Sequence, residues 1–231
     1  MHEHTLPTDP SADWSAWHRG RTFAAAWVVL LPEPAPRLVE LARGRLGEIV
    51  WPQYRRQPHV TVRFAGLMAE PEGQSQGYQS QGHQAQGHQA QGYQAEGYQA
   101  EGYGEPELVR DLAAVSAVVE GPITLTTGEW GTFPTTPHLV VQGEWLHRAH
   151  RVLPAEGGDP PPQYLPHLSV GSHRVRVPLQ SVLHRLGEAP APVTWTVERL
   201  HLVRYRAAEF DGPLEVVGEL DLTTGQFTRR I

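Results

Sequence analysis

Two stretches of the sequence decide the fold: Pro58-His59-Val60-Thr61-Val62-Arg63-Phe64 and Pro166-His167-Leu168-Ser169-Val170-Gly171. In both stretches polar and apolar side chains alternate, which is typical of a β-strand with one buried face. Residues two positions apart share a face, so each strand is expected to present an imidazole beside a hydroxyl. If the first strand is regular, Arg63 lies on the same face as His59 and Thr61.

The flanking sequence predicts the same order of elements twice. Each half reads strand, helix, motif strand, helix, strand, which indicates an internal duplication. We therefore expect an α+β fold with two lobes related by a pseudo-twofold axis, two largely antiparallel sheets, helices on the outer faces and a central cleft. Besides the two motif strands, the hydrophobic patterns predict strands at 22–31, 123–127, 138–142, 193–205 and 214–222, and helices at 35–49, 106–119, 144–153 and 177–186.

Two segments fall outside this pattern. Residues 1–21 are polar and are expected to form a mobile N-terminal tail. Residues 74–103 repeat a five-residue unit with glycine, glutamine and tyrosine or histidine, and contain no aliphatic side chain larger than alanine. Such a segment has no apolar residues from which to build a core, so we expect a disordered insert. The remainder of 22–231 is expected to form a single bilobal domain.

Composition excludes several classes of protein. The 231 residues contain no cysteine, so disulfide scaffolds, thiolate nucleophiles and cysteine-ligated metals are excluded. All 19 basic residues are arginine, which excludes every lysine mechanism. The net charge of −6 does not favour non-specific binding to nucleic acid or to membranes. Without a long apolar run or a secretory signal, we expect a soluble, cytoplasmic monomer with no membrane contact.

The paired motifs carry more weight than either motif alone. A single His-x-Ser/Thr pattern arises by chance and favours a structural histidine. Two of them, each with intervening apolar residues, a preceding proline and an equivalent place in its half, favour a shared site. His138 also follows a proline, but it lacks the hydroxyl two positions later and lies on a different element, so it is left out of the predicted site.

These features resemble the 2H phosphoesterase superfamily, and specifically its group of 2′-5′ RNA ligases and RNA 2′,3′-cyclic phosphodiesterases. That group is marked by two His-φ-Thr/Ser-φ motifs, where φ is apolar, and both motifs here fit. The segment Gly131–Phe133 and the closing strands also agree with it. Ser169 stands where threonine is commoner, which keeps the hydroxyl, whereas the insert at 74–103 is not a family feature.

The resemblance implies a function and roles for the motif residues. His59 would donate a proton to the leaving oxygen, and His167 would accept one from water. The hydroxyls of Thr61 and Ser169 would hold the phosphate oxygens. Histidine suits both proton transfers because its ordinary pKa is near neutral pH. The implied substrates are RNA with a 2′,3′-cyclic phosphate end or small nucleotides, without metal or cofactor, and the reverse reaction would join RNA ends through a 2′-5′ bond.

Further candidates are weaker. Arg63 could bind phosphate or be a solvated edge residue, while Phe133, Tyr164 and Trp130 could stack on a base or pack in the core. Other residues have no assigned role: Arg174, Arg204 and Arg206 could line the cleft, and His147 and His150 are interpreted as solvated helix histidines. Two other functions stay open: a 2H enzyme for another small cyclic or 2′-5′ nucleotide, and a nucleotide- or RNA-binding module without turnover.

Overall fold

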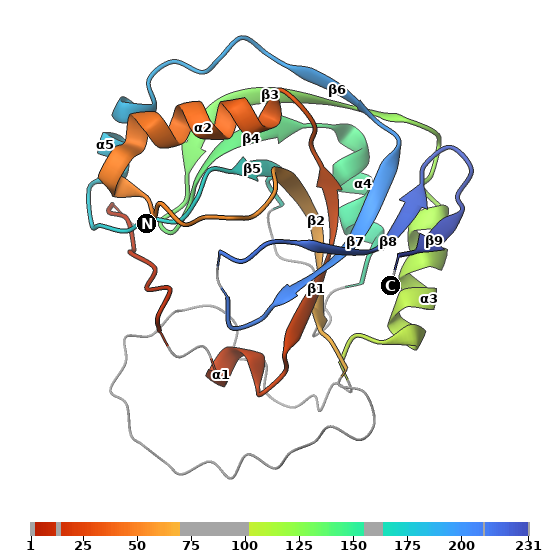
Figure 1. Cartoon of the computed structure of the whole chain (residues 1–231). Helices are drawn as coiled ribbons and strands as arrows, with labels where there is room; N and C mark the ends of the chain where they lie inside the picture. The colour runs from red at the N-terminus through yellow and green to blue at the C-terminus, as the bar shows by residue number, and fades with distance from the viewer. Residues whose placement is uncertain (1–2, 13–14, 70–101, 155–163, 210, 231) are drawn as a thin grey trace.

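The structure is a computed structural model, and it describes residues 3–12, 15–69, 102–154, 164–209 and 211–230. Its strands pair antiparallel into one nine-stranded sheet in the order β6-β3-β4-β5-β2-β1-β7-β8-β9 (Figure 1). The strands are β1 (Phe23–Leu30), β2 (His59–Leu67), β3 (Ile123–Thr132), β4 (Pro137–Gln142), β5 (His167–Ser169), β6 (Thr194–Val197), β7 (Arg199–Arg206), β8 (Glu215–Asp221) and β9 (Phe227–Arg229).

The expected division into two sheets is wrong for the described strands. The two motif strands, β2 and β5, pair with each other at Val60 and Leu168, and this contact joins the two halves into one sheet. Both residues are buried in the main core, together with Trp27 and Leu139 from the neighbouring strands. The polar motif residues are therefore directed to the other face of the sheet.

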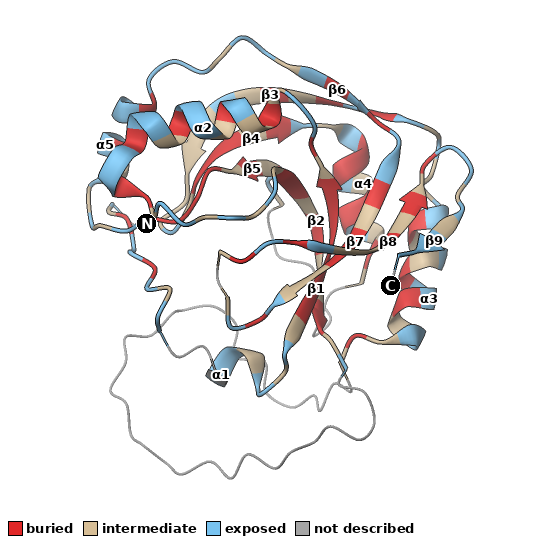
Figure 2. Cartoon of the chain, in the orientation of Figure 1, coloured by how far each residue is buried: buried red, intermediate tan, exposed pale blue. Residues whose placement is uncertain are grey.

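The helices are α1 (Ser15–His18), α2 (Ala35–Leu46), a 3₁₀ helix (Gly47–Ile49), α3 (Glu105–Ser116), α4 (Glu144–Val152) and α5 (Leu179–Leu186). All of them except α1 contribute buried apolar residues to the core clusters of the protein. Buried and exposed positions alternate with helical spacing, as the bands of colour in Figure 2 show. Trp145 and Leu146 of α4 pack into the main core, and Leu46 of α2 meets Leu186 of α5 in a second apolar cluster. No helix among the described residues has the length and apolar character needed to cross a membrane.

The sheet is strongly curled. The predicted strand 193–205 is divided at Glu198 into β6, which pairs with β3, and β7, which pairs with β1 and β8. These two strands are separated by five others in the sheet order, which would place them about 29 Å apart in a flat sheet. One residue spans only about 3.5 Å. The sheet must therefore bend back on itself, and Figure 1 shows β6 running directly into β7.

Residues 3–8 do not form part of the mobile tail that the sequence predicts for residues 1–21. Residues 3–8 form backbone hydrogen bonds with three distant segments, including Thr5 N to Val177 O at 2.8 Å and Thr8 N to His173 O at 2.9 Å. The Thr5 side chain is fully buried, and its hydroxyl donates to Val175 O at 2.7 Å. Polar composition indicated a tail, but backbone groups of residues 3–8 and the Thr5 hydroxyl form hydrogen bonds with the body of the protein.

The structure describes only the last two residues of the predicted insert. Residues 74–101 lie outside the described part of the chain, whereas Gly102 and Tyr103 belong to the fold. Tyr103 is buried and its backbone pairs with that of Leu67 and Ala69. Gly102 has a φ of 88°, and a Cβ there would lie 2.7 Å from Ala69 N. Residues 69 and 102 are therefore adjacent in the fold.

Candidate active site

The antiparallel pairing of β2 with β5 brings the two motifs together. Since Val60 lies opposite Leu168, His59 lies opposite Ser169 and Thr61 lies opposite His167. Directly opposed side chains on one face have Cβ atoms about 4.5–5.5 Å apart, and the diagonal pair of histidines is separated by about 7–8 Å. A local two-fold axis thus relates one imidazole and hydroxyl to the other.

Both motif histidines are held by backbone carbonyl groups. Nδ1 of His59 lies 2.7 Å from Gln57 O, and Nδ1 of His167 lies 2.8 Å from Leu165 O. A carbonyl oxygen can only accept, so Nδ1 carries the proton in each ring and Nε2 is the nitrogen that titrates. The two rings are therefore prepared in the same tautomer, each with Nε2 available for proton transfer.

Burial lowers the pKa of both imidazoles, which favours their neutral forms in the free protein. It lowers the pKa of His59 to about 4, against the hydrogen bond to Gln57, while the charges of Arg56 and His167 lower it further. Burial also lowers the pKa of His167, opposed by its hydrogen bond to Leu165. An anion bound between the rings would oppose this desolvation and favour protonation of one of them.

A third histidine, His138, belongs to the same site. In the register of β4 with β5 it lies opposite Ser169, so its side chain shares the face of the motif residues. Its ring centroid is 5.1 Å from that of His167 and 4.2 Å from that of Phe133, on which it stacks. Like the motif histidines, it follows a proline and places Nδ1 near the carbonyl two residues earlier, Thr136 O, at 3.3 Å. That shared local pattern was the signal in the sequence that could have found it.

Phe133 is the one weaker candidate that the structure places beside the motif residues. Its ring meets His167 edge-on, with centroids 5.1 Å apart, and stacks on His138. The Phe133 side chain is half-buried. It can therefore orient the His167 ring and still offer part of its surface to a ligand.

Arg63 does not share the face of His59, because β2 is irregular. Val28 pairs with Thr61 but Trp27 pairs with Arg63, so β2 holds an extra residue at this point. Paired residues share a face, and Trp27 is fully buried in the main core. Arg63 is accordingly buried on the helix side of the sheet, and its Nε donates to Pro154 O at 3.2 Å.

Tyr164 and His150 hold Arg63 on that side. Arg63 Nη1 donates to His150 Nε2 at 3.1 Å, and His150 Nδ1 donates to Val62 O at 2.7 Å. The Tyr164 ring stacks on His150 at 4.0 Å, and its hydroxyl donates to Thr61 O at 2.9 Å. His150 is thus a buried core histidine rather than the solvated one that the sequence predicts, and Tyr164 and Arg63 support β2 from behind.

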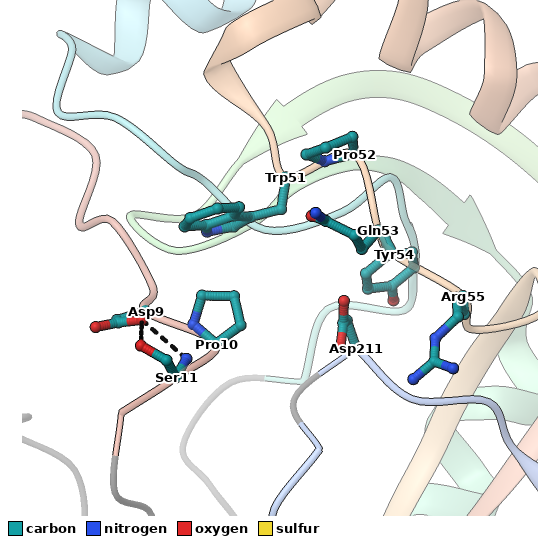
Figure 3. Close-up of a pocket in the computed structure, with 9 residues that line it drawn as sticks. All are labelled: Asp9, Pro10, Ser11, Trp51, Pro52, Gln53, Tyr54, Arg55 and Asp211. Atoms are coloured by element: carbon teal, nitrogen blue, oxygen red, sulfur yellow. Dashed lines mark hydrogen bonds between the residues drawn. The ribbon is translucent and has the colours of Figure 1, made fainter.

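Two neighbouring cavities share Tyr54 in their walls, and one of them reaches the second motif. One, of about 350 Å³, includes Ser169 in its wall. The other, of about 660 Å³, is drawn in Figure 3, with Trp51 and Gln53 opposite Asp9 and Ser11. Tyr54 lines both cavities, and its hydroxyl shares a hydrogen bond with Ser169.

Comparison with known proteins agrees with this geometry. The sequence model of the 2′-5′ RNA ligase superfamily matches residues 31–209. The fold is similar to that of TT0787 of Thermus thermophilus, with a TM-score of 0.50 and 18% sequence identity, over 86% of this chain and 97% of that chain. A solved structure described as a phosphoesterase has a TM-score of 0.47 and 14% identity, over 87% of this chain and 99% of that chain. No curated protein matches the chain.

The family match spans both motif strands, the paired histidines and hydroxyls between them, and most of the sheet that positions them. At 18% identity the likeness to TT0787 concerns the fold alone. The chain belongs to the 2′-5′ RNA ligase superfamily, as the resemblance of its two motifs implied.

Proposed function

We propose that this protein opens 2′,3′-cyclic phosphates, at the ends of RNA or on small nucleotides, by acid–base catalysis with two histidines. The observation that carries the proposal is the pairing of Val60 with Leu168, because it places an imidazole and a hydroxyl on each side of one point on the sheet. Opening a cyclic phosphate is an in-line displacement that needs a base on one side of phosphorus and an acid on the other.

The reaction requires two proton transfers. A water oxygen forms a bond to phosphorus as its proton passes to Nε2 of His167. The bond from phosphorus to one ribose oxygen breaks, and that oxygen takes the proton from Nε2 of His59. These roles follow the family resemblance, and they exchange in the reverse direction. A 5′-hydroxyl in place of water would join two RNA ends, and we expect hydrolysis to dominate because water is abundant.

The hydroxyls and the neighbouring ring complete the proposed site. Thr61 and Ser169 would donate hydrogen bonds to the non-bridging phosphate oxygens, where negative charge increases in the transition state. Phe133 would offer part of its face to a base. The residues in these roles need no metal or cofactor to move the two protons.

The test is turnover of an RNA with a 2′,3′-cyclic phosphate end, in the presence of EDTA. Wild type should be active, and His59→Ala and His167→Ala should each lose roughly 10²- to 10⁴-fold in rate. The position of the phosphate in the product identifies the leaving oxygen. Equal activity in wild type and both variants would refute the proposal, and so would complete loss of activity on adding EDTA.

A further inference from the structure

The cavity beside Ser169 contains an arginine that belongs to neither motif. This residue is Arg56, which lies three positions before His59 in the chain and lines the cavity together with Tyr54 and Tyr205. Its guanidinium carbon lies 4.3 Å from the centroid of the Tyr205 ring, so the planar group is stacked on an aromatic face. The position of Arg56 beside the motifs is therefore set by packing.

One buried hydrogen-bond donor of Arg56 has no partner in the part of the chain that the structure describes. Its Nε is buried, and no described residue accepts a hydrogen bond from it. A buried donor without a partner is uncommon in folded proteins and indicates a bound group that completes the site. The adjacent Arg55 differs, because its Nη2 donates to the carboxylate of Glu209 at 3.1 Å.

The loop that carries Arg56 is itself held in place. Arg43 donates through Nη2 to Trp51 O at 3.0 Å and to Pro52 O at 2.7 Å, which ties the loop to α2. Tyr54, in the same loop, shares its hydroxyl with Ser169. The loop conformation thus links Arg56 to the second motif, although Arg56 precedes the first.

The proposed reaction needs a positive charge at this position. Phosphate oxygens gain negative charge in the transition state, while the two motifs provide neutral hydroxyls and imidazoles whose pKa values are lowered. The chain has no lysine. The cavity also contains Glu209, but that carboxylate is paired with Arg55 at 3.1 Å and Arg206 at 3.6 Å.

The larger neighbouring cavity is more acidic. Its wall includes the carboxylates of Asp9 and Asp211 and one guanidinium, that of Arg55, which is already in an ion pair (Figure 3). Hydrogen bonds from Ser11 lower the pKa of Asp9, so this carboxylate stays ionised at neutral pH. A phosphate group is therefore favoured in the cavity of Arg56 over the one drawn in Figure 3.

We propose that Arg56 is a third phosphate ligand of the site, and that its guanidinium donates to the non-bridging oxygens of the reacting phosphoryl group beside the hydroxyls of Thr61 and Ser169. This inference rests on the proposed function, since it assigns a substrate contact for that reaction. A guanidinium presents paired N–H donors that match phosphate oxygens, which a hydroxyl cannot do.

The experiment compares Arg56→Gln, Arg56→Lys and the matched control Arg55→Gln. We measure kcat/KM for adenosine 2′,3′-cyclic phosphate, and the dissociation constants of inorganic phosphate and adenosine 2′-monophosphate by calorimetry. Arg56→Gln should lower kcat/KM by about 100-fold and weaken both ligands by at least about tenfold. Arg56→Lys should recover part of each loss, and Arg55→Gln should lose much less than Arg56→Gln, because Glu209 keeps its ion pair with Arg206. Thermal unfolding followed by circular dichroism identifies any variant that fails to fold.

Three outcomes would overturn the assignment of Arg56. The first is wild-type binding and turnover in Arg56→Gln, and the second is an equal loss in Arg55→Gln. The third is weaker binding of the nucleotide with unchanged binding of inorganic phosphate, since Arg56 would then contact the nucleoside. Repeating the binding measurements in the His59→Ala background separates this inference from the proposed function, because they do not depend on turnover.

Discussion

The lowered pKa values of the two motif histidines predict an unusual dependence of activity on pH. The perturbation is a change of pH over a range in which the substrate does not titrate, because a cyclic phosphate diester carries one negative charge throughout. The proposed reaction requires one protonated and one neutral imidazole. Burial lowers the pKa of His59 to about 4 and also lowers that of His167 from its ordinary 6.5. Above pH 6.5 both imidazoles are therefore neutral in the free protein.

The size of the effect follows from these values. Above the pKa values of both groups, the fraction of protein with one protonated imidazole falls tenfold for each pH unit. Since kcat/KM reports the free enzyme, it should decrease by about 100-fold between pH 6.5 and pH 8.5. The predicted decrease is the same whichever histidine is the acid. Protein protonated only at His59 and protein protonated only at His167 carry the same number of protons, so their populations change with pH in the same way. In contrast, kcat reports the bound complex, where the phosphate anion raises the pKa of the imidazole, so its decrease should begin at higher pH.

The assay is hydrolysis of adenosine 2′,3′-cyclic phosphate at constant ionic strength across this pH range. A parallel titration of the histidine ring signals by NMR gives the pKa of His59 directly, with His59→Gln to assign its signal. A profile of kcat/KM that is flat or rises between pH 6.5 and pH 8.5 would refute the reasoning. A measured pKa of His59 at or above 6.5 would refute its structural premise.

Three further predictions concern stability and the support of the site. Asp111→Ala should lower the free energy of unfolding by about 2–5 kcal/mol in urea titrations, because Trp27 Nε1 at 2.9 Å and the Tyr103 hydroxyl at 3.0 Å would lose their buried acceptor. Asp111→Asn keeps an acceptor oxygen and should lose less stability, so equal losses in the two variants would contradict this account. Gly131→Ala should lower kcat/KM with little change in the urea midpoint, because the new Cβ would lie 2.4 Å from His138 Nε2 and displace that ring towards the motif residues. Unchanged kinetics would show that His138 does not support the site. Acidification should destabilise the protein, because burial lowers the pKa of His138 from 6.5 to about 4, so the unfolded chain binds the extra proton. This contribution of up to about 3 kcal/mol is complete above pH 6.5 and is lost as the pH falls towards 4, and a urea midpoint that does not change over this window would exclude it.

The local features of the site could be predicted from the sequence. Alternation around His59 and His167 indicates two strands with one polar face, and the interspersed Val60 and Leu168 indicate the buried layer below them. These inferences succeed because side-chain direction in a strand depends on only two or three consecutive residues. The resemblance of the two motifs to a known family was confirmed by the match over residues 31–209.

Features that depend on strand pairing could not be predicted in this way. The regular alternation of β2 would place Arg63 beside His59, but an extra residue against β1 turns it to the helix side. His138 has no hydroxyl residue two positions later, but the pairing of β4 with β5 places it opposite Ser169. Arg56 precedes the first motif, and only the packing of its loop directs it to the cavity of the second.

The sequence by itself therefore determined the two motif strands, their polar and apolar faces, and the family to which the chain belongs, because these follow from local periodicity and short patterns. The tertiary structure alone decided that the described strands form one curled sheet, that residues 3–8 are bound to its body, and that His138 and Arg56 join the paired motifs. The physical reason is that strand order, register and loop packing depend on contacts between residues far apart in the chain, and no local pattern records which segments will meet.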